Sequence, residues 1–381
     1  MKQLIGKPVN FKQAIIGKIK HKSTLTIRPR DIILVTEQIP RVSIGFQAVL
    51  ANCDAGKNID KYKFPLVYGI ENIQKLKDDD VVLIEPNGSI NILYEKSSKN
   101  NVLLITQGCN CSCIMCPQNI SDSEKDYGWL DLNKKLISLI DRKTQYLGIT
   151  GGEPTLKKED LLEIISDCKK RLPHTSLALL TNGMLLDNFD YVKKLVSIKH
   201  PDLTFQIPLY SDTDTEHNRI IGANGFYKTI KGIHNLALFK QKIEIRTVIH
   251  ALTYKRLPNL AEFIYRNFPF ANHVALMGLE VEGLAKNNIA KLWIDPHNYN
   301  DELEKAVVFL HRSFMNVSIY NHQLCILSKP MWPFAKKAIS SWKNIYLQIC
   351  DKCAVQQLCG GFFASSMFKR SEYLHPITKP V

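Results

Sequence analysis

The stretch Cys109-Asn-Cys111-Ser-Cys113-Ile-Met-Cys116-Pro117 places four of the chain's 10 cysteines on one short segment. Cys109, Cys113 and Cys116 have the spacing C-x3-C-x2-C, which chance would produce only about 0.007 times in a chain of this length and cysteine content. Three thiolates on one loop can bind three irons of a [4Fe–4S] cluster and leave the fourth iron open to a substrate or cofactor. The segment therefore predicts an iron–sulfur site that performs chemistry.

Two other interpretations of these cysteines remain open. A structural zinc site needs a fourth ligand nearby, and Cys111 is the candidate, although it lies only two residues from both Cys109 and Cys113. That spacing is awkward for four tetrahedral ligands. The cysteines could also be unrelated buried thiols. Close-spaced cysteines in a cytosolic chain are more often metal ligands than disulfides, so the iron–sulfur interpretation is favoured.

The region around this segment alternates short apolar runs with amphipathic stretches. Candidate strands begin near six positions: Val102, Tyr146, Ser176, Leu203, Ile243 and His273. Segments with helical spacing lie between them: Leu130–Arg142, Lys157–Arg171, Asn188–Ile198, Gly225–Lys240 and Leu257–Asn267. Repeated alternation of strand and helix indicates an α/β fold with parallel strands joined by right-handed crossovers. A (βα)6 partial barrel and an open doubly wound sheet both fit this pattern.

A second motif, Thr150-Gly151-Gly152-Glu153-Pro154-Thr155, directly follows the second candidate strand. Glycines at the carboxyl end of a strand let the backbone approach a ligand closely, and the Glu153 carboxylate can accept hydrogen bonds from an ammonium group. The alternative is an ordinary turn between strand and helix, with Pro154 near the first helical position.

The flanking regions differ from the α/β region. Residues 1–98 are predicted to form a small β-rich domain, with a turn at Pro86–Ser89 and short strands at Leu25–Arg28, Ile32–Val35, Val81–Glu85 and Ile90–Glu95. The α/β region is predicted to cover residues 99–290. Residues 291–381 are predicted to form a separate cysteine-rich module, because the alternation breaks near residue 290.

The cysteine-rich module contains the spacing C-x2-C-x5-C at Cys350, Cys353 and Cys359, and Cys325 lies 25 residues before Cys350. Four thiolates can hold a [4Fe–4S] cluster with no open iron, which suits electron transfer. A structural Zn(Cys)4 site is the alternative. Cys53 and Cys168 remain unassigned and are interpreted as ordinary buried thiols.

Together, the two motifs resemble the radical S-adenosylmethionine (SAM) superfamily. The resemblance implies a (βα)6 partial barrel in which Cys109, Cys113 and Cys116 bind the radical-initiating cluster. It further implies that Gly151, Gly152 and Glu153 contact the methionine part of SAM. The resemblance implies three further cofactor contacts. Asn182 lies in Leu180-Thr-Asn-Gly183, and Ser211 is the candidate contact to the ribose. Met115 is the implied apolar contact to adenine, at a position that is often aromatic in the superfamily.

The second cysteine group resembles the SPASM and twitch-type extensions of radical SAM enzymes, which carry auxiliary [4Fe–4S] clusters. The resemblance implies one auxiliary cluster held by Cys350, Cys353, Cys359 and Cys325.

The stretch from about Val81 to Pro376 is similar to the C-type radical SAM maturase family of the His-Xaa-Ser system. The similar segments are Gly148–Leu156, Ile207–Asp212, His273–Glu280, Leu292–Pro296, Val317–Cys325, Trp332–Ala335, Trp342–Asn344 and Cys359–Phe363.

This similarity implies a bacterial oxidoreductase-type enzyme that modifies a ribosomally made peptide with His-Xaa-Ser repeats by hydrogen-atom abstraction. It implies reductive cleavage of SAM to a 5′-deoxyadenosyl radical, a second radical SAM maturase as partner, and an electron donor such as flavodoxin or ferredoxin. Glu280 and Glu282 follow the sixth candidate strand. They are either catalytic acid–base or peptide-binding residues, or solvated carboxylates of a loop, and both interpretations remain open. His322 is a candidate peptide contact or, more simply, a satisfied local histidine.

Composition limits the alternatives. The 381-residue chain is 45% hydrophobic and carries a net charge of +14, mostly as lysine spread along the sequence without a recognisable nucleic-acid-binding module. No apolar run approaches the roughly 20 residues that span a membrane, and no secretory signal begins the chain. We therefore expect a cytoplasmic protein with neither membrane nor nucleic acid as partner. A radical SAM enzyme acting on a small molecule and a non-enzymatic zinc protein binding nucleic acid are the competing hypotheses.

Overall fold

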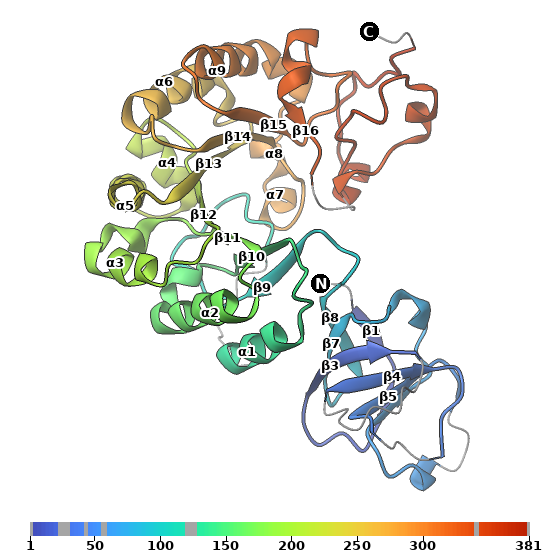
Figure 1. Ribbon diagram of the computed structural model, residues 1–381. Coiled ribbons are helices and arrows are strands. Elements are labelled where there is room, and N and C mark those ends of the chain that lie inside the picture. Colours follow the sequence, from blue (N-terminus) through green and yellow to red (C-terminus); the bar gives the residue numbers. More distant parts are fainter. Residues whose placement is uncertain are drawn as a thin grey trace. The chain divides into compact units, whose positions relative to one another are not determined.

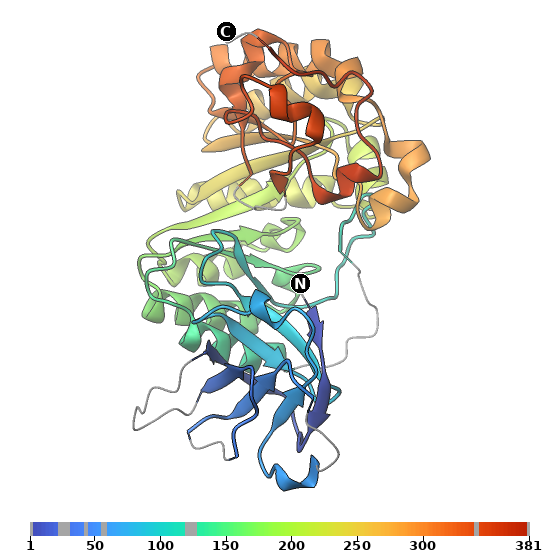
Figure 2. The same ribbon diagram turned by 90° about the vertical axis from the view of Figure 1, so that its right-hand side faces the viewer.

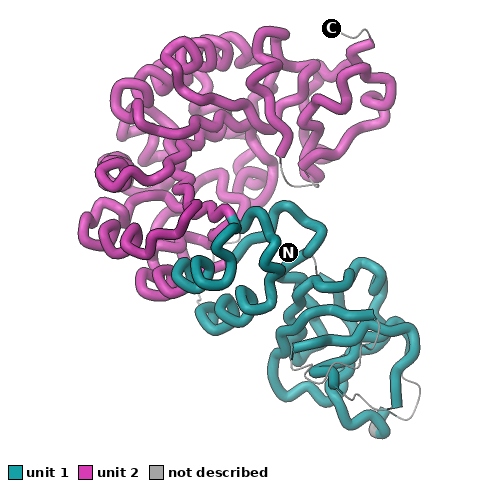
Figure 3. Tube along the Cα trace, in the orientation of Figure 1, with its two compact units in different colours: residues 1–103, 126–147, 164–175 teal, residues 104–125, 148–163, 176–381 magenta. Residues whose placement is uncertain are grey.

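The computed structural model describes residues 3–21, 31–41, 45–54, 59–118, 128–338 and 343–378. The chain divides into two compact units, which Figure 3 shows in different colours. One unit contains residues 1–103, 126–147 and 164–175, and the other contains residues 104–125, 148–163 and 176–381. The predicted strand at Leu25–Arg28 lies outside the described residues.

The N-terminal region forms an eight-stranded mixed sheet of its own (Figure 1). Its strand order is β1-β8-β7-β3-β4-β5-β6-β2. The strands are β1 (Gln3–Ile5), β2 (Lys7–Val9), β3 (Ile15–Lys20), β4 (Ile32–Thr36), β5 (Ala48–Ala51), β6 (Leu66–Tyr68), β7 (Val81–Ile84) and β8 (Ser89–Tyr94).

This sheet closes on itself. Strands β1 and β2 stand at opposite ends of the strand order, yet only Gly6 separates them along the chain. β1 pairs with β8 while β2 pairs with β6, so one extended segment joins both ends of the sheet. Closure of this kind removes free sheet edges, and fully buried side chains such as Ile19, Ile33 and Leu50 fill the core.

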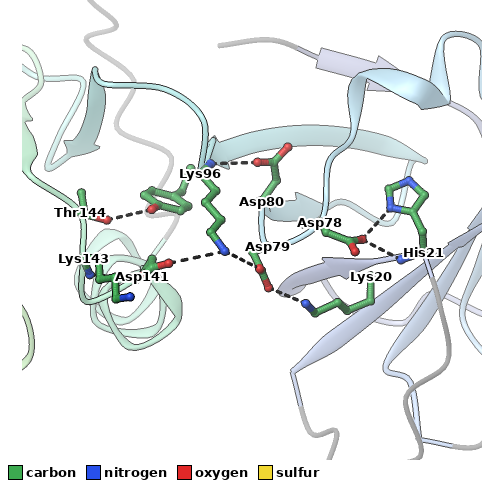
Figure 4. Close-up of polar contacts among 10 residues, drawn as sticks. Lys20, His21, Asp78, Asp79, Asp80, Lys96, Asp141, Lys143 and Thr144 are labelled. Atoms are coloured by element: carbon green, nitrogen blue, oxygen red, sulfur yellow. Dashed lines mark hydrogen bonds and ion pairs between the residues drawn. The ribbon is translucent and has the colours of Figure 1, made fainter.

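An ion-pair network holds the surface of this N-terminal region (Figure 4). The Asp79 carboxylate lies 2.8 Å from Lys20 Nζ and 2.7 Å from Lys96 Nζ, and Lys96 Nζ lies 3.6 Å from Asp141. Burial works against the charged form of Asp79, but the hydrogen bonds from Lys20 and Lys96 outweigh it and lower its pKa to about 2. The network joins β3, the turn before β7, the segment after β8 and the turn after helix α1 (Trp129–Leu139).

The second sheet also has eight strands, in the order β16-β15-β14-β13-β12-β11-β10-β9. The pairs from β11 to β16 are parallel. The strands are β9 (Asn101–Leu104), β10 (Tyr146–Thr150), β11 (Ser176–Leu180), β12 (Leu203–Pro208), β13 (Lys242–Ile249), β14 (His273–Gly278), β15 (Val317–Tyr320) and β16 (Ala335–Lys336).

The order of this sheet is strictly sequential. A doubly wound sheet reverses its strand order at a switch point, so the sequential order rules out that alternative. Right-handed crossovers between successive neighbours put every helix on one face, as in a barrel. Figure 1 shows α3 (Phe189–Ser197), α5 (Phe226–Leu238), α6 (Leu257–Asn267) and α9 (Asn300–Arg312) along one side of the strands. The prediction of an α/β fold with a parallel sheet is confirmed.

Helices α1, α2, α3, α5 and α6 follow the predicted amphipathic segments, whereas the sequence pattern did not indicate α4, α7 and α8. α3, for example, buries Tyr191, Val192 and Leu195 on one face. The helices after α1 are α2 (Lys158–Arg171), α3 (Phe189–Ser197), α4 (Asp214–Ile221), α5 (Phe226–Leu238), α6 (Leu257–Asn267), α7 (Leu284–Asn287), α8 (Ile289–Leu292) and α9 (Asn300–Arg312). Among the described residues, no helix is both long and apolar enough to cross a membrane.

The sheet continues past residue 290, where a new module was expected to begin. α9 leads into β15, which pairs in parallel with β14 through Val274↔Val317, and β16 extends the sheet further. The irregular cysteine-rich segment therefore begins only after β16. It contains the short 3-10 helices η9 (Gln348–Lys352) and η10 (Ala364–Met367). Figures 1 and 2 show this red segment on the side of the strands away from α3, α5, α6 and α9.

Candidate functional site

The loop that follows β9 carries the first cysteine group and is fixed to the end of α4. The backbone N–H groups of Ser112 and Ile114 donate to the carbonyls of Ile221 and Ile220, at 2.9 and 3.1 Å. Gly222 ends α4 with φ +64°, and a Cβ there would lie 2.8 Å from the Ser112 carbonyl oxygen. A glycine is required at this position, because both the conformation and the close approach exclude a side chain.

The four thiols of this loop lie close together and are shielded from water. Cys111 is buried, and Cys109, Cys113 and Cys116 are half-buried. A hydrogen bond with Cys111 and burial raise the pKa of Cys109, and burial raises that of Cys116. The thiolate, not the thiol, binds metal, so a cluster bound here must displace protons.

The Glu153 carboxylate lies at the carboxyl end of β10 and is only 1% exposed. Its Oε1 accepts hydrogen bonds from Thr155 N at 3.0 Å, Thr155 Oγ1 at 2.6 Å and Thr181 Oγ1 at 2.6 Å. Its Oε2 accepts a 2.6 Å bond from Asn182 N. Burial raises the pKa of Glu153, although these donors act in the opposite direction. Glu153 thus ties the end of β10 to the end of β11, and its contact with methionine stays a prediction.

The two glycines before Glu153 connect β10 to the cysteine loop. Gly152 N donates to Thr106 O, and Glu153 N donates to Gly108 O, each at 2.8 Å. A Cβ on Gly152 would lie 2.1 Å from the Gly108 carbonyl oxygen. The structure therefore requires a glycine at position 152 for contact between two backbone segments.

Asn182 links Glu153 to the cysteines. Its side-chain Nδ2 lies 2.7 Å from Asn110 Oδ1 and 3.4 Å from Cys111 Sγ, while its backbone N–H binds Glu153. The structure thus brings together the cysteine loop, Glu153 and Asn182.

Met115 and Ser211 have local partners. Met115 is buried in an apolar cluster with Ile220, Ala285 and Leu292. Ser211 Oγ accepts a 3.2 Å hydrogen bond from Thr213 N and so shapes the turn before α4. Their predicted contacts with adenine and ribose stay predictions.

Tyr210 lies beside the thiols and was not anticipated from the sequence. Tyr210 packs against the two apolar clusters that contain Met115 and Cys111, and its ring stacks on His217 at 5.8 Å between ring centroids. Burial raises the pKa of Tyr210 well above its ordinary value, and the nearby thiols act in the same direction. Tyr210 lies in the segment between β12 and α4, and it reaches the cysteine loop through tertiary packing. No local sequence signal marks it.

The second cysteine group lines one cavity. Cys325, Cys350, Cys353 and Cys359 all face about 330 Å³ of empty space, together with apolar side chains and His375. Backbone N–H groups of Leu324 and Gly361 donate to Cys359 Sγ, both at 3.5 Å. Burial raises the pKa of Cys325, and a hydrogen bond from the His375 backbone N–H works against that rise. The unassigned Cys168 is fully buried, as expected, whereas Cys53 is half-buried.

Glu280 and His322 lie beyond the carboxyl ends of β14 and β15. Glu280 Oε2 pairs with Lys343 Nζ at 3.1 Å, and burial raises the pKa of Glu280. His322 is buried; its Nδ1 donates to the Tyr320 carbonyl and its Nε2 accepts from Tyr299 OH, each at 2.8 Å. Burial lowers the pKa of His322 to about 4, so it is a neutral core residue.

This part of the chain is similar to one family of known proteins. A family model for the radical SAM superfamily matches residues 103–264. These residues form a radical SAM domain. The domain contains Cys109, Cys113, Cys116, Glu153 and Asn182, and it implies a [4Fe–4S] cluster and SAM.

Curated relatives of the radical SAM domain are distant. A probable GTP 3′,8-cyclase from Saccharolobus islandicus is 24% identical over 210 residues, which are 54% of this chain and 63% of that protein. A GTP 3′,8-cyclase from Campylobacter jejuni is 24% identical over 242 residues, which are 58% of this chain and 72% of that protein. The chain thus spans less than two thirds of the archaeal relative.

Two solved structures are distantly similar to this chain. Streptococcus suis SuiB is 17% identical with a TM-score of 0.45, over 58% of this chain and 49% of that chain. Native anSMEcpe with bound AdoMet and Kp18Cys peptide is also 17% identical with a TM-score of 0.45, over 57% of this chain and 62% of that chain.

The donors in the radical SAM domain fit an iron–sulfur cluster. Cys109, Cys113 and Cys116 offer three thiols from one loop, and a cubane takes one thiolate at each iron. Among the described residues, no three His, Cys, Asp or Glu side chains gather as the ligands of a single metal ion would. The cysteines of the second cavity lie outside the residues that the family model matches.

Proposed function

We propose that the chain is a radical SAM enzyme that modifies a ribosomally made peptide with His-Xaa-Ser repeats by hydrogen-atom abstraction. The observation that carries the proposal is the link from the cysteine loop through Asn182 to Glu153 within a radical SAM domain. When bound, the cluster and SAM supply an electron and a 5′-deoxyadenosyl radical.

The chain's own residues position and shield that chemistry. Asn182 and the backbone of Gly152 fix the cysteine loop against the ends of β10 and β11. Tyr210 and Met115 form an apolar wall beside the thiols, which limits the access of water. These contacts keep the loop in one conformation before any cofactor binds.

The second cavity supports a further part of the proposal. Four thiols around one cavity suit an auxiliary [4Fe–4S] cluster with no open iron, which could accept the electron left after bond formation. The proposed partners are a second radical SAM maturase and an electron donor such as flavodoxin or ferredoxin. The peptide class itself rests on the similarity of segments such as Val317–Cys325 and Cys359–Phe363 to the His-Xaa-Ser maturases.

A small-molecule substrate is the second candidate function. Its support is that the curated relatives are named GTP 3′,8-cyclases. The N-terminal sheet also bears on this choice: among the described strands, β1 and β2 join the two ends of the sheet, which disfavours the addition of a leader peptide as a further strand.

The cofactor content tests the radical chemistry. The protein is purified without oxygen, and iron and sulfide are counted beside a Cys109→Ala/Cys113→Ala/Cys116→Ala variant. We expect about eight irons in the parent and about four in the variant, with 5′-deoxyadenosine formed from SAM under dithionite only by the parent. Zinc without iron or sulfide would contradict the proposal and favour a zinc protein.

The substrate class needs its own measurement. The cluster-loaded parent is incubated with SAM, dithionite and either a His-Xaa-Ser repeat peptide or GTP, and the products are read by mass spectrometry. We expect a mass change in the peptide that depends on SAM. A change in GTP alone would support the small-molecule function.

A further inference from the structure

Another cavity, distinct from the one that the cysteines line, lies at the carboxyl ends of the strands. It is open to solvent and offers about 460 Å³ of empty space. Ile249, Gly278 and Asn321, which end or follow β13, β14 and β15, form one wall. Its other wall is the segment Phe362–Ser371. Parallel α/β folds bind their ligands at this end of the strands.

Part of the lining of this cavity is apolar. Trp293, Ile294 and Pro296 come from the segment before α9, and Phe362 and Phe363 come from the cysteine-rich segment. Both phenylalanines are buried, so their rings form a fixed surface. Such a surface binds the apolar part of a ligand and removes water from the polar groups beside it.

The charged groups of the lining are cationic. Lys369 and Arg370 line the cavity, and none of the described lining residues is an aspartate or glutamate. Lys369 Nζ lies 5.5 Å from the centroid of the Trp293 ring. Its carboxylate partner is Glu372, 4.0 Å away and 83% exposed, and exposed pairs of this kind are weak. A bound anion can therefore replace Glu372 at little cost.

Two amides add hydrogen-bonding capacity. Asn321 Nδ2 donates to the Gly278 carbonyl at 3.1 Å, and Gln323 Nε2 donates to the Gly361 carbonyl at 2.8 Å. These bonds fix the orientation of both amides and leave their oxygens as acceptors. Amide oxygens at the wall of a cavity suit the backbone N–H groups of a peptide.

The cavity also adjoins the auxiliary cysteines. Gln323 and Phe362 line both cavities, so a group bound here lies one side-chain layer from the thiols of Cys325 and Cys359. An electron path between the substrate and an auxiliary cluster needs this kind of proximity.

We propose that this cavity binds an acidic side chain of the peptide substrate. The carboxylate binds Lys369 and Arg370, and the neighbouring backbone N–H groups bind Asn321 and Gln323. The inference rests on the proposed function and narrows it: the preferred repeats carry Asp or Glu at the variable position. The net charge of +14 favours the same acidic ligands over long range.

The test uses the cluster-loaded protein and two fluorescein-labelled peptides, one built of His-Glu-Ser repeats and the other of His-Gln-Ser repeats. Fluorescence anisotropy measures binding without SAM turnover. We expect the parent to bind the Glu peptide about tenfold more tightly, since a hydrogen bond to a charged group contributes roughly 1.5–3 kcal/mol. The Lys369→Gln/Arg370→Gln variant should bind both peptides alike.

A matched control separates the cavity from overall charge. The Lys228→Gln/Lys231→Gln variant removes the same charge from exposed positions on α5. It should keep the preference for the Glu peptide. Equal binding of both peptides by the parent, or equal loss of preference in both double variants, would overturn the inference.

The same preparations test the proposed function separately. A protein that forms 5′-deoxyadenosine but does not discriminate between the peptides contradicts the cavity assignment alone. A protein that prefers the Glu peptide but never cleaves SAM contradicts the proposed function alone. Circular dichroism and thermal unfolding of each variant confirm that the substitutions leave the fold intact.

Discussion

The Glu153 carboxylate and the backbone N–H of Asn182 form a 2.6 Å hydrogen bond between the ends of β10 and β11. Both residues belong to motifs that the sequence assigned to cofactor binding. In the structure these residues also hold the cysteine loop, because the Asn182 side chain donates hydrogen bonds to Cys111 Sγ and Asn110 Oδ1. The geometry of the thiols therefore depends on a carboxylate that never touches them.

Replacement of Glu153 by Gln should weaken this link. The buried carboxylate accepts four hydrogen bonds and donates none, so an amide NH2 in its place faces at least one donor. An unsatisfied buried group costs about 1–3 kcal/mol. We expect a lower midpoint of urea unfolding and less iron at the first site. Glu159→Gln, at an exposed position of α2, is the control and should change neither quantity. Full iron content with unchanged stability would contradict this role.

Substitution of Gly152 by Ala should displace the cysteine loop. The added Cβ would lie 2.1 Å from the Gly108 carbonyl oxygen, so the backbone has to move. We expect the Gly152→Ala protein to lose iron from the first site and to keep iron in the second cavity. Gly69→Ala adds a methyl group at φ +66° with nothing within 4 Å, and it should leave both iron counts unchanged. An unaltered iron count in Gly152→Ala would refute the tight contact.

Cluster loading should depend on pH through the thiols. Burial raises the pKa of Cys116 and of Cys325, and a hydrogen bond with Cys111 helps to raise that of Cys109. Each thiol loses its proton when it binds iron, so iron uptake becomes more favourable as the pH rises. Anaerobic reconstitution between about pH 6 and about pH 9 should show increasing iron per chain. Loading that stays constant over this range would mean that the thiols are already ionised.

The ion-pair network around Asp79 should stabilise the N-terminal region above about pH 4. Burial disfavours the charged carboxylate, but Lys20 and Lys96 outweigh it and lower the pKa from 3.8 to about 2. A lowered carboxyl pKa contributes stability that is complete above the unfolded value and is lost as the pH falls through the folded value. We expect Asp79→Asn to cost about 1 kcal/mol at neutral pH after allowance for solvent screening, and progressively less as the pH falls through about 2.

Urea unfolding at several pH values measures this difference. Asparagine is a suitable replacement because residue 79 has φ 71°, a conformation that Asn accepts readily. Glu71→Gln, an exposed change in the same region, is the control. A difference that stays undiminished as the pH falls to about 2, or that high salt does not reduce, would exclude an electrostatic origin.

The sequence predicted the α/β pattern because each strand is a short apolar run and each helix has an apolar face. Strands such as β11 at Ser176–Leu180 and β12 at Leu203–Pro208 begin where the pattern indicated. This pattern does not predict which strands pair with one another when they lie far apart in the sequence. β15 lies in the region that was predicted to be a separate module, but its pairing with β14 places the sheet's end past residue 290. The closure of the N-terminal sheet through β1 and β2 is likewise a matter of pairing.

The candidate site likewise contains some residues that the sequence predicted and others that it did not. Motif spacing predicted a grouping of Cys325 with Cys350, Cys353 and Cys359, and these residues line one cavity. Tyr210 and His375 were not anticipated, because each reaches the thiols only through the packing of distant segments. The roles of Met115, Ser211 and Glu280 depend on ligands and stay predictions.

The backbone N–H of His375 should tune an auxiliary cluster through Cys325. It donates to the Cys325 thiol, and the segment that carries it is held in place by bonds from Ser371 and Glu372 to Asp295 and from Ala354 to Ile377. N–H donors stabilise the reduced, more negative form of a cluster and so raise its reduction potential. His375→Pro removes the N–H and the ring, whereas His375→Ala removes only the ring. We expect a more negative potential for the proline variant and little change for alanine.

The measurement is a redox titration followed by electron paramagnetic resonance in the Cys109→Ala/Cys113→Ala/Cys116→Ala background, where we expect only the second site to be loaded. Equal iron counts confirm an intact site, and Glu372→Gln controls for a change elsewhere on the segment. Identical potentials in the proline variant and the parent would show that this hydrogen bond does not act on the cluster.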